Sequence, residues 1–170
     1  SGYSMEKATK MTMGPDGNYY VSQWGATKNK VVRFNGTTGA FIDEFTSVGF
    51  GADNAMGHAW DASGRLYVVG FASRDVKRFD ANGNYLGVFI STAAGQLQGP
   101  VNIWFDNNNN LYIEDWQANN IKKYNASTGA FISVFISTGL NNPEGFTFDQ
   151  AGNIYISNYT GNTVSKYDAN

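Results

Sequence analysis

Few side chains in this sequence have an obvious catalytic use. His58, in the stretch MGHAW, is the only histidine, and the chain has no cysteine, which excludes disulfides and thiolate chemistry. His58 would serve as a general base if the protein were an enzyme. No partner for it is visible in the sequence, so a structural role is the simpler interpretation. Motifs for phosphate loops, zinc sites, serine nucleophile elbows and dinucleotide loops are absent.

Polar side chains recur at equivalent places in four copies of one sequence pattern. The copies align on a turn residue, which we call the anchor, at Gly17, Gly64, Asn109 and Gly152. Six residues after each anchor, the chain holds Gln23, Gly70, Asp115 and Asn158. Glu144 and Asn102 stand near the start of the first strand that is expected in their copies. This pattern predicts five ligand-binding residues: Gln23, Asn102, Asp115, Glu144 and Asn158.

A structural alternative exists for these polar residues. Asp and Asn at the end of a strand commonly satisfy backbone amides, which would give Asp115 and Asn158 no direct contact with a ligand. Glu114 beside Asp115 suggests a pair of carboxylates. Adjacent residues in a strand point to opposite faces, however, so these two cannot act together directly.

The spacing of the anchors predicts the fold. Consecutive anchors are 47, 45 and 43 residues apart, which is the period of a propeller blade. Each copy begins with a short apolar strand and a polar turn whose anchor tolerates a positive φ. A second strand rich in β-branched and aromatic residues follows, then a third that alternates apolar with basic positions (VVRF, VKRF, IKKY, VSKY), then a fourth (GAFIDEF, GNYLGVF, GAFISVF).

An aromatic residue stands seven positions after each anchor. These residues are Trp24, Phe71, Trp116 and Tyr159. We expect their side chains to pack between neighbouring blades, because aromatic side chains bury large areas. The alternative is that they form, with Trp60 and Trp104, an aromatic platform for a sugar or another flat ligand.

Composition agrees with a single all-β domain spanning residues 1–170. The chain is 42% apolar and 15% aromatic, contains 20 glycines, and has only 15% charged residues. No segment shows helical periodicity for long enough to predict a helix. The repeats cover about residues 9–55, 56–99, 100–142 and 143–170, with residues 1–8 as a lead-in and residues 46–55 as a long connection.

The fourth repeat stops before its outer strand, since its last residues, Asp168-Ala169-Asn170, match Asp80-Ala81-Asn82 in the second. An unpaired strand edge is normally closed, covered or paired with a partner. Three arrangements stay open: a four-bladed ring, half of a larger ring completed by a second chain in a homodimer, or a piece of a longer propeller.

Charge and hydropathy exclude some partners. The net charge is −2 and the basic residues form no stripe, so we expect no nucleic acid partner. No apolar run approaches the length of a membrane span, so we expect no membrane partner. The abundance of Asn, Thr, Ser, Gly and Tyr is typical of extracellular or cell-surface β-proteins.

The repeats resemble those of the NHL-repeat propellers. The fourth copy, PEGFTFDQAGNIYISNYTGNTVSKYD, is close to the consensus P-x-G-h-x-h-D-x-x-G-x-h-Y-h-x-D/N, whereas the third, PVNIWFDNNNNLYIEDWQANNIKKYN, lacks both expected glycines. In blade pattern the chain is also similar to gluconolactonase-like enzymes, which hold a divalent cation at the axis, and to virginiamycin B lyase-like propellers, which use a histidine and acidic residues with magnesium.

The resemblance to the gluconolactonase-like family implies a cation site. It places Glu144 and Asn158, with Asp115 and Asn102, as oxygen ligands suited to Ca²⁺ or Mg²⁺. Two functions therefore follow from the sequence. The first is a non-catalytic module that binds a protein, peptide or glycan on one face of the ring. The second is a metal-assisted hydrolase or lyase of the lactonase-like type.

Overall fold

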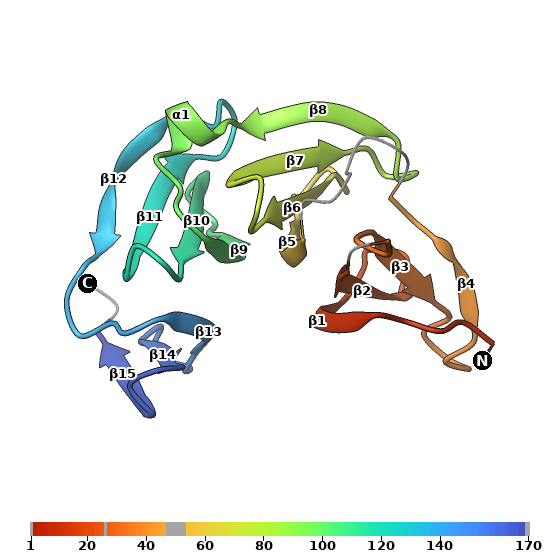
Figure 1. Ribbon diagram of the computed structural model, residues 1–170. Coiled ribbons are helices and arrows are strands. Elements are labelled where there is room, and N and C mark those ends of the chain that lie inside the picture. The colour runs from red at the N-terminus through yellow and green to blue at the C-terminus, as the bar shows by residue number, and fades with distance from the viewer. Residues whose placement is uncertain (1, 26, 47–53, 169–170) are drawn as a thin grey trace.

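The chain folds into four antiparallel sheets arranged as the blades of a propeller (Figure 1). The computed structural model describes residues 2–25, 27–46 and 54–168. Within each sheet the strands follow chain order, so the predicted all-β propeller of four repeats is confirmed. The strands are β1 (Lys7–Met13), β2 (Tyr19–Trp24), β3 (Val31–Phe34), β4 (Phe41–Glu44), β5 (Ala55–Trp60), β6 (Leu66–Gly70), β7 (Asp75–Phe79), β8 (Tyr85–Ile90), β9 (Pro100–Phe105), β10 (Asn110–Asp115), β11 (Asn120–Asn125), β12 (Phe131–Ile136), β13 (Pro143–Phe148), β14 (Ile154–Asn158) and β15 (Thr163–Tyr167).

The turn between the first and second strand of each blade depends on the anchor residue. Gly17, Gly64 and Gly152 have φ values of 76°, 75° and 84°, and Asn109 has 60°, so all four adopt the left-handed conformation that the sequence predicts. An aspartate before the anchor fixes the turn through its side chain. Asp106, for example, accepts hydrogen bonds from the backbone N–H groups of Asn108 and Asn110 and from the hydroxyl of Tyr112.

The hydrophobic core lies between the blades. Three buried clusters join successive sheets, and each contains side chains from both sheets that it joins. The first contains Tyr20, Val31, Phe45, Ala55, Leu66, Val68 and Phe79; the second Tyr67, Val69, Val76, Ile90, Leu97, Ile103, Leu111, Ile113 and Tyr124; the third Trp104, Tyr112, Ile121, Ile136, Ile154 and Ile156. Because burial of apolar area is the main stabilising term in folding, each blade depends on its neighbours.

The blades are packed in sequence order along an arc. β1 and β2 pack on β5, β5 and β6 pack on β9, and β9 and β10 pack on β13. Figure 1 shows the first and the fourth blade at the two ends of this arc. Apolar side chains are exposed at both ends. Met11 of β1 is 64% exposed and Val164 of β15 is 66% exposed, whereas Val76, which occupies the position of Val164 in the second blade, is fully buried.

The structure differs from the sequence-based expectation at two places. β1 begins at Lys7, because Lys7 and Ala8 pair with Trp24 and Gln23, so the end of the expected lead-in belongs to the first blade. One helical turn, α1 (Thr92–Gly95), lies in a connection for which the sequence predicts no helix. Its first turn is capped by Ser91, whose hydroxyl accepts a hydrogen bond from the N–H of Ala94.

The fourth sheet contains β13, β14 and β15, which agrees with a last repeat that lacks its outer strand. Residues 169 and 170 at the end of this repeat, and residues 47–53 of the long connection after the first repeat, lie outside the described residues. No helix within the described ranges is long and apolar enough to cross a membrane.

Candidate functional site

The predicted site residues lie on one face of the propeller, which we call the site face. In each blade the start of the first strand pairs with the end of the second, as Pro100 does with Asp115 and Pro143 with Asn158. The anchor turns join the other ends of the same strands. We call the face that carries these turns the turn face.

Four aromatic side chains form a continuous row across the site face. Each belongs to a different blade and stands at or just after the end of its second strand. The ring centroids of Trp24 and Phe71 are 5.0 Å apart, those of Phe71 and Trp116 are 6.2 Å apart, and those of Trp116 and Tyr159 are 6.4 Å apart. These distances are typical of interacting aromatic pairs, so the row links the blades as expected.

The same row lines a pocket, which we call the aromatic pocket. Its volume is about 390 Å³, and it is lined by Trp24, Met56, Phe71, Val101, Trp116, Glu144 and Tyr159. Tyr159 is 68% exposed at one end of the row. These side chains contact one another between blades, as the packing interpretation expects, and they also present a concave apolar surface to solvent. Trp60 and Trp104 do not line this pocket and instead contact Tyr20 and Phe146. Ligand binding by the aromatic residues stays a prediction.

Among the described residues that line the aromatic pocket, Glu144 has the only charged side chain. It lies in β13 and is exposed. Within the described part of the chain, its carboxylate has no hydrogen bond or ion pair. Glu144 is therefore available to a ligand, and among the five predicted ligand-binding residues it is the one that lines this pocket.

The carboxylate of Asp115 is fully bonded to groups of its own blade. Its carboxylate is fully buried and accepts hydrogen bonds from the backbone N–H groups of Gln98, Gly99 and Ala118, at 2.9, 2.8 and 3.3 Å. Lys122 Nζ lies 2.6 Å from Asp115 Oδ2 and completes a buried ion pair. Since Gln98 and Gly99 lead directly into β9, Asp115 holds the start of the first strand against the end of the second.

Asn158 and Gln23 perform the same task in the fourth and first blades. Asn158 Oδ1 accepts a hydrogen bond from the N–H of Asn141, and Gln23 Oε1 accepts one from the N–H of Glu6. Both donors precede the first strand of their blade, and both acceptor side chains are buried. The geometry thus corresponds to the structural alternative for the position six residues after the anchor.

A polar cluster that the sequence did not reveal lies behind the aromatic pocket. Asn102 Nδ2 donates to Glu114 Oε2 at 3.1 Å and to the backbone oxygen of Glu144 at 2.9 Å. Lys10 Nζ, from the first blade, donates to Asn102 Oδ1 at 2.6 Å and lies 5.0 Å from the ring centroid of Phe146. Asn102 therefore connects the first, third and fourth blades, and it acts as a structural bridge beneath Glu144.

Glu114 is the unusual member of this cluster. It is fully buried, and its Oε1 has no hydrogen-bond partner among the described residues. The pKa of Glu114 is raised to about 7, chiefly by burial; the charge of Glu144 adds to this rise, whereas the hydrogen bond from Asn102 and the charge of Lys10 oppose it. Burial also lowers the pKa of Lys10, against the attraction of Glu114. Strand alternation separates Glu114 from Asp115, but only the structure shows that Glu114 faces Lys10.

His58 is enclosed in the structure. It is 1% exposed; Thr12 Oγ1 lies 2.7 Å from its Nε2 and Ser22 Oγ lies 2.7 Å from its Nδ1. Burial and the nearby charge of Lys10 lower the pKa of His58 to about 3, so the ring is neutral at physiological pH. With both ring nitrogens engaged by hydroxyls, His58 ties β5 to β1 and β2, and this geometry supports the structural role.

The three predicted metal ligands are not all free to bind a cation in this arrangement. Among the described residues, no group of three or more His, Cys, Asp or Glu side chains is placed to hold a metal ion. Oxygen atoms of Asp115 and Asn158 already accept backbone N–H groups, which leaves Glu144 as the one uncommitted ligand. Binding of Ca²⁺ or Mg²⁺ stays a prediction.

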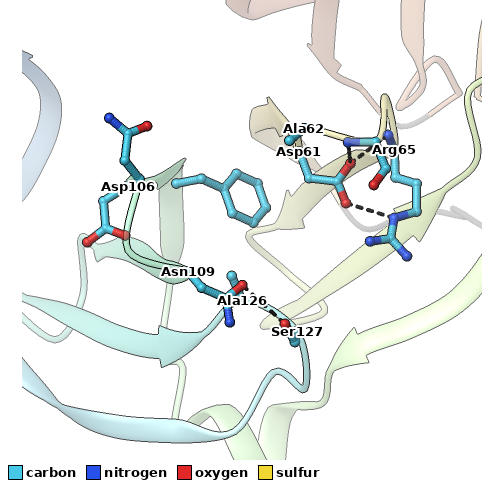
Figure 2. Close-up of a pocket in the computed structure, with 10 residues that line it drawn as sticks. Asp61, Ala62, Arg65, Asp106, Asn109, Ala126 and Ser127 are labelled. Atoms are coloured by element: carbon cyan, nitrogen blue, oxygen red, sulfur yellow. Dashed lines mark hydrogen bonds and ion pairs between the residues drawn. The ribbon is translucent and has the colours of Figure 1, made fainter.

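A larger pocket of about 620 Å³ lies on the turn face between the second and third blades (Figure 2). Asp61, Arg65, Asp106, Asn109 and Ser127 contribute to its lining. Figure 2 shows Asp61 bonded to Arg65 and Asn109 bonded to Ser127, so these polar groups already have partners. We regard the smaller aromatic pocket as the better candidate because its charged group has no partner among the described residues.

The sequence matches no protein-family model and no curated protein. Solved structures are similar in fold. A protein of unknown function from Bacteroides caccae superposes with a TM-score of 0.70 at 17% identity, over 95% of this chain and 63% of that one. A catalytically inactive virginiamycin B lyase from Staphylococcus aureus with quinupristin gives 0.73 at 16% identity, over 99% of this chain and 57% of that one.

A putative gluconolactonase superposes with a TM-score of 0.72 at 16% identity, over 89% of this chain and 57% of that one. The chain thus spans about 57–63% of the length of these three structures. At such identities the likeness concerns the fold and not the activity. The chain is a β-propeller of four blades with the fold that virginiamycin B lyase and gluconolactonase-like propellers share.

Proposed function

We propose that this propeller is a non-catalytic binding module, and that a segment of a protein, peptide or glycan docks in the aromatic pocket. One observation carries the proposal. Each of the four blades contributes an aromatic side chain to a single concave surface, and the one charged side chain on that surface, Glu144, has no partner among the described residues. Concave, mostly apolar surfaces with a few polar groups are typical of ligand sites.

The surroundings of the pocket support binding over catalysis. His58, the one histidine of the chain, is buried between two hydroxyl groups, and Glu114 is fully buried. Asp115 is saturated by backbone N–H groups and Lys122. Glu144 therefore stands alone, and a single exposed carboxylate beside aromatic rings is suited to holding a ligand.

The proposal is tested by selecting ligands from unbiased libraries. The purified chain would be screened against a phage-displayed peptide library and a glycan array. Three variants would then be compared with the wild-type protein. Trp116→Leu and Tyr159→Ala alter the aromatic pocket, and Asn107→Ala alters the turn-face pocket. Circular dichroism would confirm that each variant is folded.

We expect the selected ligands to lose at least tenfold in affinity for Trp116→Leu and Tyr159→Ala and to retain their affinity for Asn107→Ala. Because Tyr159 is exposed, we expect Tyr159→Ala to fold like the wild-type protein. The reverse pattern would assign the ligand to the turn face. Absence of any specific ligand from both libraries would also contradict the proposal.

A further inference from the structure

We infer that the aromatic pocket recognises a cationic group, such as the quaternary ammonium of choline or the methylated ammonium of a lysine side chain. This inference rests on the proposed function, because it names the chemical class that the same pocket would take. Three features of the structure support it: the spacing of the aromatic rings, the charge of the lining, and the scarcity of hydrogen-bonding groups.

The spacing of the rings suits a cation. An ammonium ion interacts favourably with an aromatic face at about 6 Å or less from the ring centroid. Phe71 and Trp116 have centroids 6.2 Å apart, and Trp116 and Tyr159 have centroids 6.4 Å apart. A methylated ammonium seated over two neighbouring rings would therefore lie within this range of both. Tryptophan, present twice in the row, is the strongest of these partners.

The charge of the lining is negative. Glu144 is the one charged residue that lines the pocket, and its carboxylate makes no ion pair with any described residue. Lys10, the cation behind it, is turned toward Asn102 and the ring of Phe146 and faces the buried Glu114. At the other end of the row, Trp24 shares a neighbouring pocket with Glu6 and Lys7, whose charges are opposite. Among the described residues, no neighbouring charge therefore offsets that of Glu144.

The polar groups of the lining are too few for a sugar. Of the described residues that line the pocket, besides Glu144, only Tyr159 through its hydroxyl and Trp24 and Trp116 through their indole N–H groups can readily form side-chain hydrogen bonds. A sugar ring on this surface would find few direct hydrogen-bond partners for its hydroxyls. A quaternary ammonium group, as in choline or trimethylated lysine, has no N–H and therefore no such hydrogen bonds to lose. The lining therefore favours the cation over the glycan.

The inference is tested with two ligands of nearly the same shape. Choline and its uncharged isostere 3,3-dimethylbutan-1-ol would be titrated into the wild-type chain, with tryptophan fluorescence and calorimetry as readouts. We expect choline to bind saturably and at least tenfold more tightly than the isostere. Equal binding of the two compounds, or no binding of choline, would overturn the inference.

Variants separate the contribution of charge from that of shape. Glu144→Gln should lower the affinity for choline about three- to tenfold and leave the affinity for the isostere unchanged. Tyr159→Ala should also lower the affinity for choline. Asp168→Asn is a matched control, because Asp168 is an exposed carboxylate that lines a different pocket. If Asp168→Asn lowered the affinity for choline as much as Glu144→Gln does, the effect would be one of net charge only, and this result would contradict the inference.

The outcomes also separate this inference from the proposed function. If library-selected ligands depend on Trp116 while choline binds no better than its isostere, the pocket binds ligands but does not select cations. If neither selected ligands nor choline depend on the pocket residues, both proposals are wrong.

Discussion

Glu114 and Asp115 are neighbours in β10 whose carboxylates lie in opposite environments. Asp115 is surrounded by three backbone N–H donors and the ammonium of Lys122. Glu114 receives one hydrogen bond, from Asn102, and its second oxygen has no partner among the described residues. Both side chains are fully buried, so the difference in their surroundings decides what each contributes to the protein.

Removal of Asp115 should be severely destabilising. Asp115→Ala would leave Lys122 buried without its counter-ion and would free two backbone N–H groups at the start of β9. We expect a loss of about 3–5 kcal/mol in the free energy of unfolding, measured by urea denaturation. Asp168→Ala, at an exposed position, should change it by less than about 0.5 kcal/mol. Similar losses in the two variants would contradict the role assigned to Asp115.

Glu114 should make stability depend on pH in the opposite sense to an ordinary ion-paired carboxylate. Its pKa is about 7 in the folded chain, against an ordinary value of 4.5, so between these values the unfolded chain has released a proton that the folded chain retains. Stability from this group is therefore lost as pH rises from about 4.5 to 7, by roughly 3 kcal/mol.

The variant Glu114→Gln isolates this effect. The free energy of unfolding of Glu114→Gln, relative to wild type, should rise between pH 4 and pH 8, with chemical denaturation at several pH values as the measurement. A difference that stays constant across this range would show that Glu114 does not titrate as the structure indicates.

Addition of Ca²⁺ or Mg²⁺ tests the remaining prediction of a metal site. Because two of the three predicted ligands are held by backbone N–H groups, we expect neither ion to raise the melting temperature. A rise that disappears in Glu144→Gln would show that the loops rearrange around a cation and would restore the metal-assisted alternative.

Residue patterns in the sequence predicted part of this site. The recurrence of Gln23, Asp115 and Asn158 after the anchors indicated a shared position, and a structural use of that position was one of the two interpretations. The cluster of Lys10, Asn102 and Glu114 could not be predicted, because its members come from different blades and occupy positions whose residue types differ from repeat to repeat. Such contacts depend on how the blades are packed, which no single repeat encodes.

At the level of elements, the anchor turns explain why the spacing of the repeats predicted the positions of the strands. A positive φ is accessible to few residue types, so the turns leave glycine or asparagine at regular intervals along the chain. Strand positions could be predicted from these intervals. The one-turn helix α1 could not, because four residues are too short for a helical period, and the start of β1 was missed because Lys7 and Ala8 carry no strand preference.

Two glycines with the same backbone conformation should respond differently to alanine. Gly83 and Gly17 have φ values of 80° and 76°, so Gly83→Ala and Gly17→Ala carry the same strain of about 1–2 kcal/mol. A Cβ at Gly17 meets open space, whereas one at Gly83 would collide with the carbonyl oxygen of Phe45 in the neighbouring blade.

We therefore expect Gly83→Ala to lower the melting temperature clearly more than Gly17→Ala, as measured by thermal unfolding. Equal effects would mean that the contact between the β7–β8 turn and Phe45 adjusts without cost.

The whole molecule is an arc with an apolar surface at each end. Met11 and Met13 are exposed on the first blade, and Val164 is exposed on the fourth. The residues at the position of Val164 in the first three blades, Val31, Val76 and Ile121, are all fully buried against the next blade. Surfaces of this kind favour head-to-tail contact between the fourth blade of one copy and the first blade of another.

We therefore expect the 170-residue chain to self-associate, with a light-scattering mass that rises above 18.6 kDa as concentration increases. Met11→Lys and Val164→Lys should each return the mass to 18.6 kDa without loss of stability, since both side chains are exposed. A wild-type mass of 18.6 kDa at every concentration would contradict this expectation.

The strand order has a consequence for how such a protein changes over generations. Each sheet is built from consecutive strands, so a blade closes its own backbone hydrogen bonds and shares only side-chain packing and a few polar contacts with its neighbours. A gene segment that encodes one repeat can therefore be duplicated or deleted without changing the strand pairing of any other sheet. The propeller can gain or lose a blade in a single genetic event, and the aromatic row gains or loses one member with it.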